Sequence, residues 1–345
     1  MGIFPTSGVW SMSDKASRLM AAWFRGLLWP LLALAALVLF NLLFTAGFAH
    51  IEIKDGHFYG SLVDVLKQAS RVMLVSLGMT LIIATAGVDL SVGAVIAIAG
   101  SLAAKLLVQA HAGLPAAILA TLGVCLVLGF WNGALVAWCG VQPIVATLIL
   151  MVAGRGVAQL LTDGQIITVE RPAFTFIAGG HFLGLPFPVT IVAAALLFTG
   201  GLTRRTAMGL FIESVGNNET ASYFAGVNAR AVKLFVYSFG GLCAGAAGLI
   251  EASTIKAADA NNAGLYLELD AILAVVIGGT ALTGGRFNLS GSLLGALIIQ
   301  TLTTTILTRG VPVQYTLVVK AVVVLAVCLL QAESFRALLL RRRRP

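Results

Sequence analysis

The chain has 345 residues, of which 59% are hydrophobic and only 10% are charged, and its formal net charge is +8. About a quarter of the residues of a soluble domain are charged, so this composition excludes a water-soluble globular protein and indicates an integral membrane protein. At about 20 residues per span, the length leaves room for about ten membrane helices. The basic residues form no face with interleaved aromatic side chains, which argues against nucleic-acid binding.

The apolar segments predict an all-α, polytopic membrane protein with about ten transmembrane helices. The expected spans are residues 27–48, 69–87, 91–109, 115–138, 143–162, 188–203, 234–254, 267–283, 291–308 and 313–332. The expected domains are a cytoplasmic segment at 1–26, a transmembrane domain at 27–332 and a basic cytoplasmic tail at 333–345. Outer loops are expected at residues 51–68, 163–188 and 255–268.

The distribution of positive charge supports a cytoplasmic location for both termini. With the N-terminus inside, the inner segments hold 13 of the 22 Lys and Arg residues and the outer segments hold 6. The remaining three, Lys105, Arg155 and Lys320, lie in or at the edge of spans. Cytoplasmic loops of membrane proteins carry an excess of Lys and Arg, so the predicted orientation agrees with the charge count.

The longest segment that cannot lie in a membrane is the polar stretch at residues 204–233, flanked on both sides by apolar runs. Its charged residues are Arg204, Arg205, Glu213, Glu219, Arg230 and Lys233. Because an even number of spans precedes it, this stretch is predicted to be a cytoplasmic loop.

Inside this loop, residues 219–225 are predicted to form a short helix. Asn217 or Asn218 would cap its start, and Glu219 would lie near the positive end of the helix dipole. Gly226 would end it. A short capped helix on a cytoplasmic loop is suited to docking in a groove of a partner protein. A solvated loop without a partner is the alternative.

Sequence motifs of the common enzymes and metal sites are absent. The phosphate-binding pattern GxxxxGK[ST] cannot occur, because the chain contains no Gly-Lys pair. The nucleophile pattern GxSxG and the zinc pattern HExxH do not occur either, and the four cysteines show no metal-ligand spacing. We therefore expect no enzyme activity, cofactor or metal in this chain, and any ATP hydrolysis would belong to another subunit.

Four motifs resemble the permease subunits of the ribose, xylose and arabinose class of bacterial ABC sugar importers. They are Met79–Gly93, Gln142–Gly156, Glu213–Asn228 and Glu268–Arg286, and they cover the chain from about residue 70 to residue 330 in the family's order. The stretches 142–168 and 258–270 are most similar to the permeases of galactofuranose importers. The combination of motifs is far more specific than any one of them.

This resemblance implies a permease subunit that imports a monosaccharide, with galactofuranose favoured, by alternating access. It implies a separate ATPase that docks on residues 216–226, a periplasmic sugar-binding protein on the outer loops, and a second permease, identical or related, in the lipid of the inner membrane. The residues that the resemblance assigns to ATPase coupling are Glu213, Gly216, Asn217, Asn218, Glu219, Ala221, Tyr223, Phe224 and Gly226. The pair Tyr223-Phe224 departs from the small or aliphatic pair of the family and is expected to tune which ATPase binds.

Polar residues at membrane depth are costly, so they are candidates for the translocation pathway. The candidates are Asp89, Asn132, Gln142, Arg155, Asn261, Asn262, Glu268 and Asp270. Structural roles remain open for the charged ones. Asp89 could cap a helix, Arg155 could form an ion pair or hold backbone carbonyls, and Glu268 and Asp270 could anchor a span at the interface.

The rival function is an autonomous secondary carrier or channel, driven by protons through Asp89, Glu268 or Asp270. Such a carrier would transport its solute without any ATPase. A lesion in the coupling loop, such as Glu219→Lys, should then have little effect, whereas it should abolish transport by an ATPase-driven permease.

Overall fold

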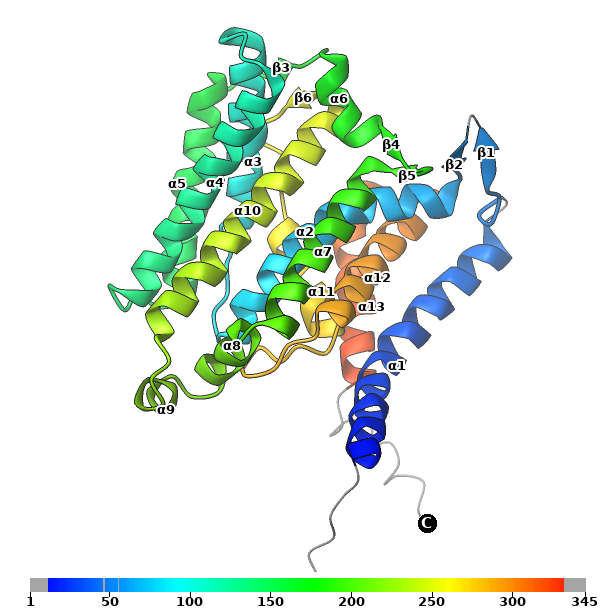
Figure 1. Ribbon diagram of the computed structural model, residues 1–345. Coiled ribbons are helices and arrows are strands. Elements are labelled where there is room, and N and C mark those ends of the chain that lie inside the picture. Colours follow the sequence, from blue (N-terminus) through cyan, green and yellow to red (C-terminus); the bar gives the residue numbers. More distant parts are fainter. Residues whose placement is uncertain (1–11, 46, 55, 332–345) are drawn as a thin grey trace, which may run out of the picture.

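The computed structural model describes residues 12–45, 47–54 and 56–331 of the chain, and this part is built almost wholly of helices (Figure 1). The helices before the polar loop are α1 (Met12–Phe44), α2 (Ser61–Ala84), α3 (Val92–Ala104) with its π-helical extension η1 (Lys105–Gln109), α4 (Leu114–Ala137), α5 (Pro143–Thr162), α6 (Pro172–Gly179) and α7 (Phe187–Arg205). The later helices are α8 (Met208–Asn217), α9 (Glu219–Phe224), α10 (Ala229–Ile255), α11 (Leu267–Ile277), α12 (Leu289–Thr308) and α13 (Val313–Gln331).

Six short strands form three antiparallel pairs outside the helix bundle. The pairs are β1 (Glu52–Lys54) with β2 (His57–Tyr59), β3 (Ile167–Thr168) with β6 (Ala257–Ala258), and β4 (His181–Phe182) with β5 (Leu185–Pro186). All of them lie at one end of the bundle together with α6, and we call this end the hairpin side (Figure 1). The opposite end, which carries α8 and α9, is called the α9 side.

The all-helical, polytopic class is confirmed. Among the described residues, eight helices are long and apolar enough to cross a membrane: α1, α2, α3 with η1, α4, α5, α7, α10 and α12. A further helix, α13, is 19 residues long and is not among these eight. The start of α1 and the end of α13 both lie on the α9 side (Figure 1). The predicted tail at 333–345 and the first residues of the predicted segment 1–26 lie outside the described residues, whereas residues 12–26 belong to α1.

The centre of the bundle consists of α2, α3, α10 and α12. The span of α2 is 78% buried, whereas that of α4 is 22% buried and that of α1 is 17% buried. Glycine lets the central and outer helices approach closely: a side chain at Gly241 of α10 would meet the backbone of Cys125 and Gly129 in α4. Close approach at small residues is the usual way in which membrane helices pack.

The predicted span 267–283 is wrong in its extent, because α11 ends at Ile277 after 11 residues. A helix of that length is about 16 Å long, roughly half of the hydrocarbon core. Two glycines explain the early end. Gly278 lies against the backbone of Gly291 at the start of α12, where no side chain fits, and Gly279 has a φ of +87° that favours glycine.

Two helices, α3 and α11, begin inside the bundle rather than at its surface. The non-helical segment 85–91 leads from the end of α2 inward to α3, and the segment 256–266 leads from the end of α10 inward to α11 (Figure 1). The two starts meet, because a Cβ atom on Gly93 would lie 2.5 Å from the carbonyl oxygen of Gly264 and 2.5 Å from Oε2 of Glu268. Non-helical backbone at membrane depth is tolerated where protein surrounds it.

The loops are shorter than predicted because several contain secondary structure. The expected outer loop 51–68 ends where α2 begins at Ser61, and the expected outer loop 163–188 contains α6 and the β4–β5 hairpin. The polar stretch 204–233 is reduced to residues 206–228 and contains the unpredicted helix α8. That helix is amphipathic, and its buried Ile212 and Val215 pack in a cluster with the end of α2.

Candidate functional site

The helix α9 lies at the end of the bundle opposite the hairpin side (Figure 1), and the sequence predicts the ATPase contact on this helix. It spans Glu219–Phe224, and the side chain of Asn218 accepts a hydrogen bond from the backbone N–H of Ala221 at 2.9 Å, as a helix cap does. Gly226, with φ of +83°, ends the turn after the helix. The predicted short helix and its Asn218 cap are therefore confirmed; Asn217 instead ends α8.

The exposed face of α9 is aromatic. The side chains of Tyr223 and Phe224 are 72% and 83% exposed, and their rings meet edge to face with centroids 5.9 Å apart. Ala221 is exposed beside them. The carboxylate of Glu219, in the first turn of α9, lies 2.6 Å from Nζ of Lys233 at the start of α10. Two large exposed rings on a short rigid helix are typical of the anchors that fill pockets in protein–protein interfaces.

The end of α8 packs between two segments. One leads from α2 to α3, and the other leads from α11 to α12. A side chain at Gly216 would clash with the carbonyl oxygen of Ala84, at the end of α2, and with the N–H of Gly285, after α11. These two groups also bind each other, because Gly285 N donates to Ala84 O at 2.9 Å. Gly216 is therefore a packing position, whereas Glu213 lies half-buried on the same helix.

Replacing Gly216 by alanine is expected to destabilise the protein by about 1–3 kcal/mol, as overpacking of a tight contact does. Gly156→Ala in α5 is the matched control, because nothing lies within 4 Å of its added Cβ atom and alanine favours a helix by about 1 kcal/mol. Thermal unfolding in detergent measures both. A Gly216→Ala midpoint at or above that of the unaltered chain would contradict the wedged position of α8.

A polar cavity of about 610 Å³ opens on the α9 side, behind α9. Its polar lining includes Gln142, Asn217, Glu219, Arg230 and Lys233, and its apolar lining includes the turn between α4 and α5. Gly87 and Tyr237 also line it, and the Tyr237 hydroxyl donates to the carbonyl oxygen of Val88 at 3.3 Å. The cavity therefore reaches from the candidate coupling helix to the non-helical segment 85–91 before α3, and its volume lies in the range of small-molecule sites.

Asp89 and Asn132 meet in the interior through Ser91. The Asp89 carboxylate accepts from the Ser91 backbone N–H at 2.8 Å and from its hydroxyl at 2.6 Å, and the Asn132 amide donates to the same hydroxyl at 2.8 Å. This network holds the turn before α3. The helix-capping alternative for Asp89 is not supported, because Asp89 bonds Ser91, the residue before the helix, and none of the N–H groups of the first turn of α3. The Asn132 carbonyl oxygen is buried without a hydrogen-bond partner in the described structure.

Two acidic side chains lie beside the starts of α3 and α11. Glu268 Oε2 is buried against Gly93 and has no hydrogen-bond partner among the described residues. Glu251 of α10 accepts from the backbone N–H of Gly264 at 3.1 Å, and its other oxygen lies 3.7 Å from Arg71 of α2. Polar groups thus gather where the two inward segments meet.

Arg155 ties α5 to the segment 256–266. Its guanidinium donates to the carbonyl oxygens of Ala260 and Ala263, at 3.1 and 2.6 Å. Of the two structural roles predicted for Arg155, the structure therefore shows the one in which it holds backbone carbonyls. Asn261 accepts from Gln159 of α5 at 2.8 Å. Asn262 donates to the Asp259 carboxylate at 2.8 Å, and this bond is the largest cause of the lowered pKa of Asp259. Both asparagines are exposed and belong to the same segment.

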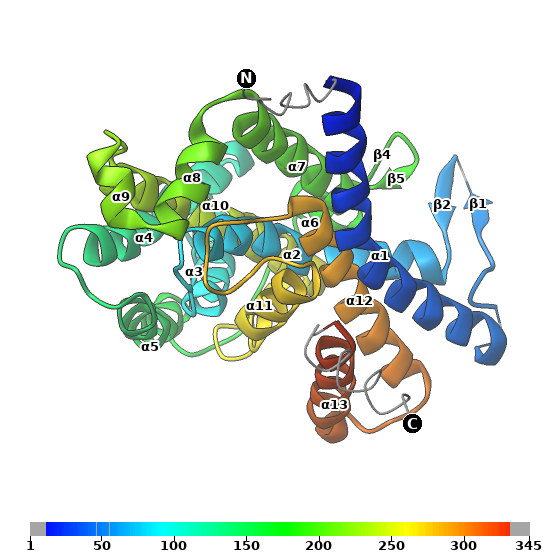
Figure 2. The same ribbon diagram turned by 90° about the horizontal axis from the view of Figure 1, so that it is seen from below.

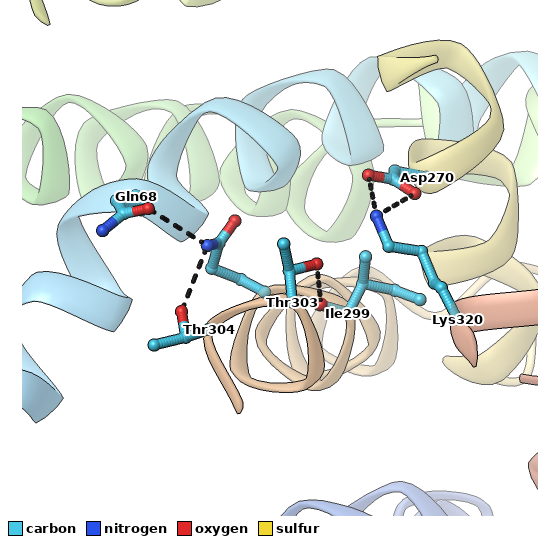
Figure 3. A network of polar contacts seen from close by, with 7 residues as sticks. Gln68, Asp270, Ile299, Thr303, Thr304 and Lys320 are labelled. Atoms are coloured by element: carbon cyan, nitrogen blue, oxygen red, sulfur yellow. Dashed lines mark hydrogen bonds and ion pairs between the residues drawn. The ribbon is translucent and has the colours of Figure 1, made fainter. Parts of the chain in front are cut away.

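Asp270 and Lys320 form an ion pair between α11 and α13. Lys320 Nζ lies 3.0 and 2.9 Å from the two carboxylate oxygens, and the two side chains are only 17% and 11% exposed. Figure 3 shows the two groups facing each other, near the contact in which Gln300 of α12 donates to Gln68 and Thr304. The pathway role of Asp270 stays a prediction, and its observed contact joins two helices.

The structure thus divides the predicted site residues into three groups, apart from Asp270, which pairs with Lys320 of α13. The coupling residues lie on α8, on α9, at their junction and, in the case of Gly226, just after α9, and Gln142 lines the cavity behind them. Asp89, Asn132 and Glu268 lie near the start of α3 in the interior of the bundle. Arg155, Asn261 and Asn262 lie around the segment 256–266. Sequence reasoning missed Tyr237, which supports the turn before α3; a lone tyrosine in an apolar run carried no signal of that contact.

Comparisons with known proteins agree with this arrangement. Residues 61–328 match the family described as branched-chain amino acid transport system / permease component. The chain is 51% identical to the galactofuranose transporter permease protein YtfT of Escherichia coli, over 90% of this chain and 92% of that protein. It is 39% identical to the fructose import permease protein FruF of Bifidobacterium longum, over 90% and 89% of the two chains.

The chain is also 38% identical to the ribose import permease protein RbsC of Escherichia coli, over 79% of this chain and 86% of that protein. A comparison with solved structures finds no match. The family model covers most of the chain, the relatives are covered almost end to end, and the resemblance predicted from the four motifs is confirmed. This multi-pass membrane protein, a transport subunit and not itself an enzyme, belongs to the family of branched-chain amino acid transport system / permease components.

Proposed function

We propose that the chain is the transmembrane subunit of an ATP-driven importer of a monosaccharide, with galactofuranose as the favoured substrate. The galactofuranose transporter permease is 51% identical over nearly the full length of both chains, which supports this choice above fructose and ribose, named in relatives of lower identity. The α9 side would face the cytoplasm and the hairpin side the periplasm of a bacterial inner membrane.

The observation that carries the proposal is the aromatic face of α9 beside a cavity that reaches the interior. A separate ATPase subunit, which would hydrolyse the ATP, would receive Tyr223 and Phe224 in a groove. A periplasmic sugar-binding protein would dock on the hairpin side, and a second permease, identical or related, would pair with this one.

The contacts of α8 support a route for the motion. A shift of α9 would move the end of α8, and Gly216 would pass the shift to Ala84 and Gly285. The first of these leads into the segment before α3, and the second follows α11. Both helices that start inside the bundle would therefore respond together, which is what alternating access between the two sides needs.

Uptake into proteoliposomes tests this function. The chain, its ATPase and the second permease are reconstituted, ATP is loaded on the side of the ATPase, and the binding protein is added on the opposite side with labelled galactofuranose or ribose. We expect uptake of galactofuranose that requires ATP and persists when a protonophore collapses the proton gradient. Uptake without the ATPase that a protonophore abolishes would instead identify the proton-linked carrier.

A further inference from the structure

A groove runs along α7 and α12 toward the α9 side and is bordered by α1. Its deeper part, about 400 Å³, is lined by leucines of the three helices, among them Leu27, Leu196 and Leu293. Its outer part, about 480 Å³, is lined by Gly200, Gly201, Arg204 and Arg205 of α7 and by the start of α12. Leu196 and Ser290 line both parts, so the two adjoin. Figure 2, seen from the α9 side, places α1 next to α7 and the start of α12.

The charges of this groove are all of one sign. Arg204 and Arg205 form the last turn of α7, and both are exposed. Within the described residues neither makes an ion pair or a side-chain hydrogen bond, and no acidic residue lines either part of the groove. Guanidinium groups bind phosphate through paired N–H donors. Ser290 lies in the first turn of α12, where the helix dipole also favours an anion.

The glycines next to the arginines leave the groove open. Gly200 lies four residues before Arg204, on the same face of α7. A Cβ atom at Gly200 or Gly201 would have no atom within 4 Å. No atom of the described residues therefore fills the space beside the last turn of α7. This space lies between the two arginines and the part of the groove that is lined by leucines.

We propose that this groove binds an anionic phospholipid. Its phosphate lies against Arg204 and Arg205, and an acyl chain follows the leucines between α1, α7 and α12. The combination of an unneutralised arginine pair with an adjoining apolar channel matches the two halves of a phospholipid. Basic pockets between transmembrane helices on the cytoplasmic side are where anionic head groups bind.

Native mass spectrometry of the full chain, purified in detergent with any subunits that accompany it, tests the proposal. The probes are phosphatidylglycerol and phosphatidylcholine with identical acyl chains. We expect tighter binding of phosphatidylglycerol. The double variant Arg204→Gln/Arg205→Gln should weaken binding of that lipid about thirty-fold and leave phosphatidylcholine almost unchanged, while Lys256→Gln on the opposite side, the charge control, should change neither.

A second variant tests the acyl channel. The Cβ atom of Gly200→Leu has nothing within 4 Å, so we expect the chain to fold as before while both lipids bind several-fold more weakly. Gly123→Leu in α4 is the matched control, because its added Cβ atom also has nothing within 4 Å and it lies outside the groove.

Four results would overturn the proposal. Equal binding of the two lipids would remove the charge argument, and full retention of phosphatidylglycerol by the double arginine variant would place it elsewhere. If inorganic phosphate, at the same concentration as the lipid, displaces phosphatidylglycerol, the groove binds phosphate alone and the leucine-lined part does not contribute. If the arginine variant keeps its lipid but loses its ATPase, the pair belongs to the protein interface.

Discussion

Replacing both Tyr223 and Phe224 by alanine is expected to abolish ATP-driven uptake while the chain still folds. The two side chains are 72% and 83% exposed, so their removal costs the isolated subunit little packing. Aromatic anchors at the centre of an interface contribute about 2–4 kcal/mol each when truncated, which is at least a thirty-fold loss of affinity. Co-purification of the ATPase with the permease measures the affinity, and sugar uptake measures the consequence.

The matched control is Phe182→Ala, which removes an aromatic ring that is 54% exposed in the β4–β5 hairpin on the opposite side. It should leave the ATPase bound. Glu219→Lys is a weaker design, because the new charge would also repel Lys233 at the start of α10. Unchanged ATPase binding and uptake in the double alanine variant would refute α9 as the coupling helix and would place the ATPase contact elsewhere on the chain.

Replacing Lys320 by methionine is expected to destabilise the protein by about 3–5 kcal/mol, because it leaves the largely buried Asp270 carboxylate without its partner. A carboxylate among membrane helices has little access to water, so the loss of its cation is costly. Unfolding of the purified chain in detergent measures the change. A variant as stable as the unaltered chain would show that the ion pair does not hold α11 to α13.

The double variant Asp270→Asn/Lys320→Met is the control for this pair. It removes both charges, so most of the stability should return. Its transport activity then separates the two roles of Asp270. Normal uptake would identify the carboxylate as a link between α11 and α13, whereas loss of uptake in a stably folded double variant would place Asp270 in the translocation pathway.

The candidate site illustrates where sequence reasoning succeeds. The helix α9 was predictable, because its cap, its length and its end depend on neighbouring residues: Asn218 binds the N–H of Ala221, and Gly226 adopts the positive φ that follows. The helix α8 was not predicted, although its apolar residues recur at helical spacing. A helix of ten residues is stable only with tertiary packing, which the contact of Ile212 and Val215 with the end of α2 supplies. A polar stretch with scattered apolar residues is equally consistent with a loop.

The contacts of Lys320 and Arg155 show why pairings between distant segments were beyond reach. Asp270 and Lys320 are 50 residues apart, and Arg155 reaches carbonyl groups 105 and 108 residues away. Each residue was recognisable as unusual, because a charge in an apolar run is costly. The identity of its partner depends on how the helices cross, and a single sequence contains no measure of that.

By itself, the sequence determined that this protein crosses the membrane many times, and it determined the approximate place of most helices. Hydropathy reports how each segment partitions between lipid and water, and that partition depends on local composition. Only the tertiary structure decided that α11 stops after 11 residues and that α3 and α11 begin inside the bundle. Surrounding helices can bury non-helical backbone at membrane depth, so an apolar run is compatible with a full span or with half of one, and the packing of glycines such as Gly93 and Gly278 selects between them.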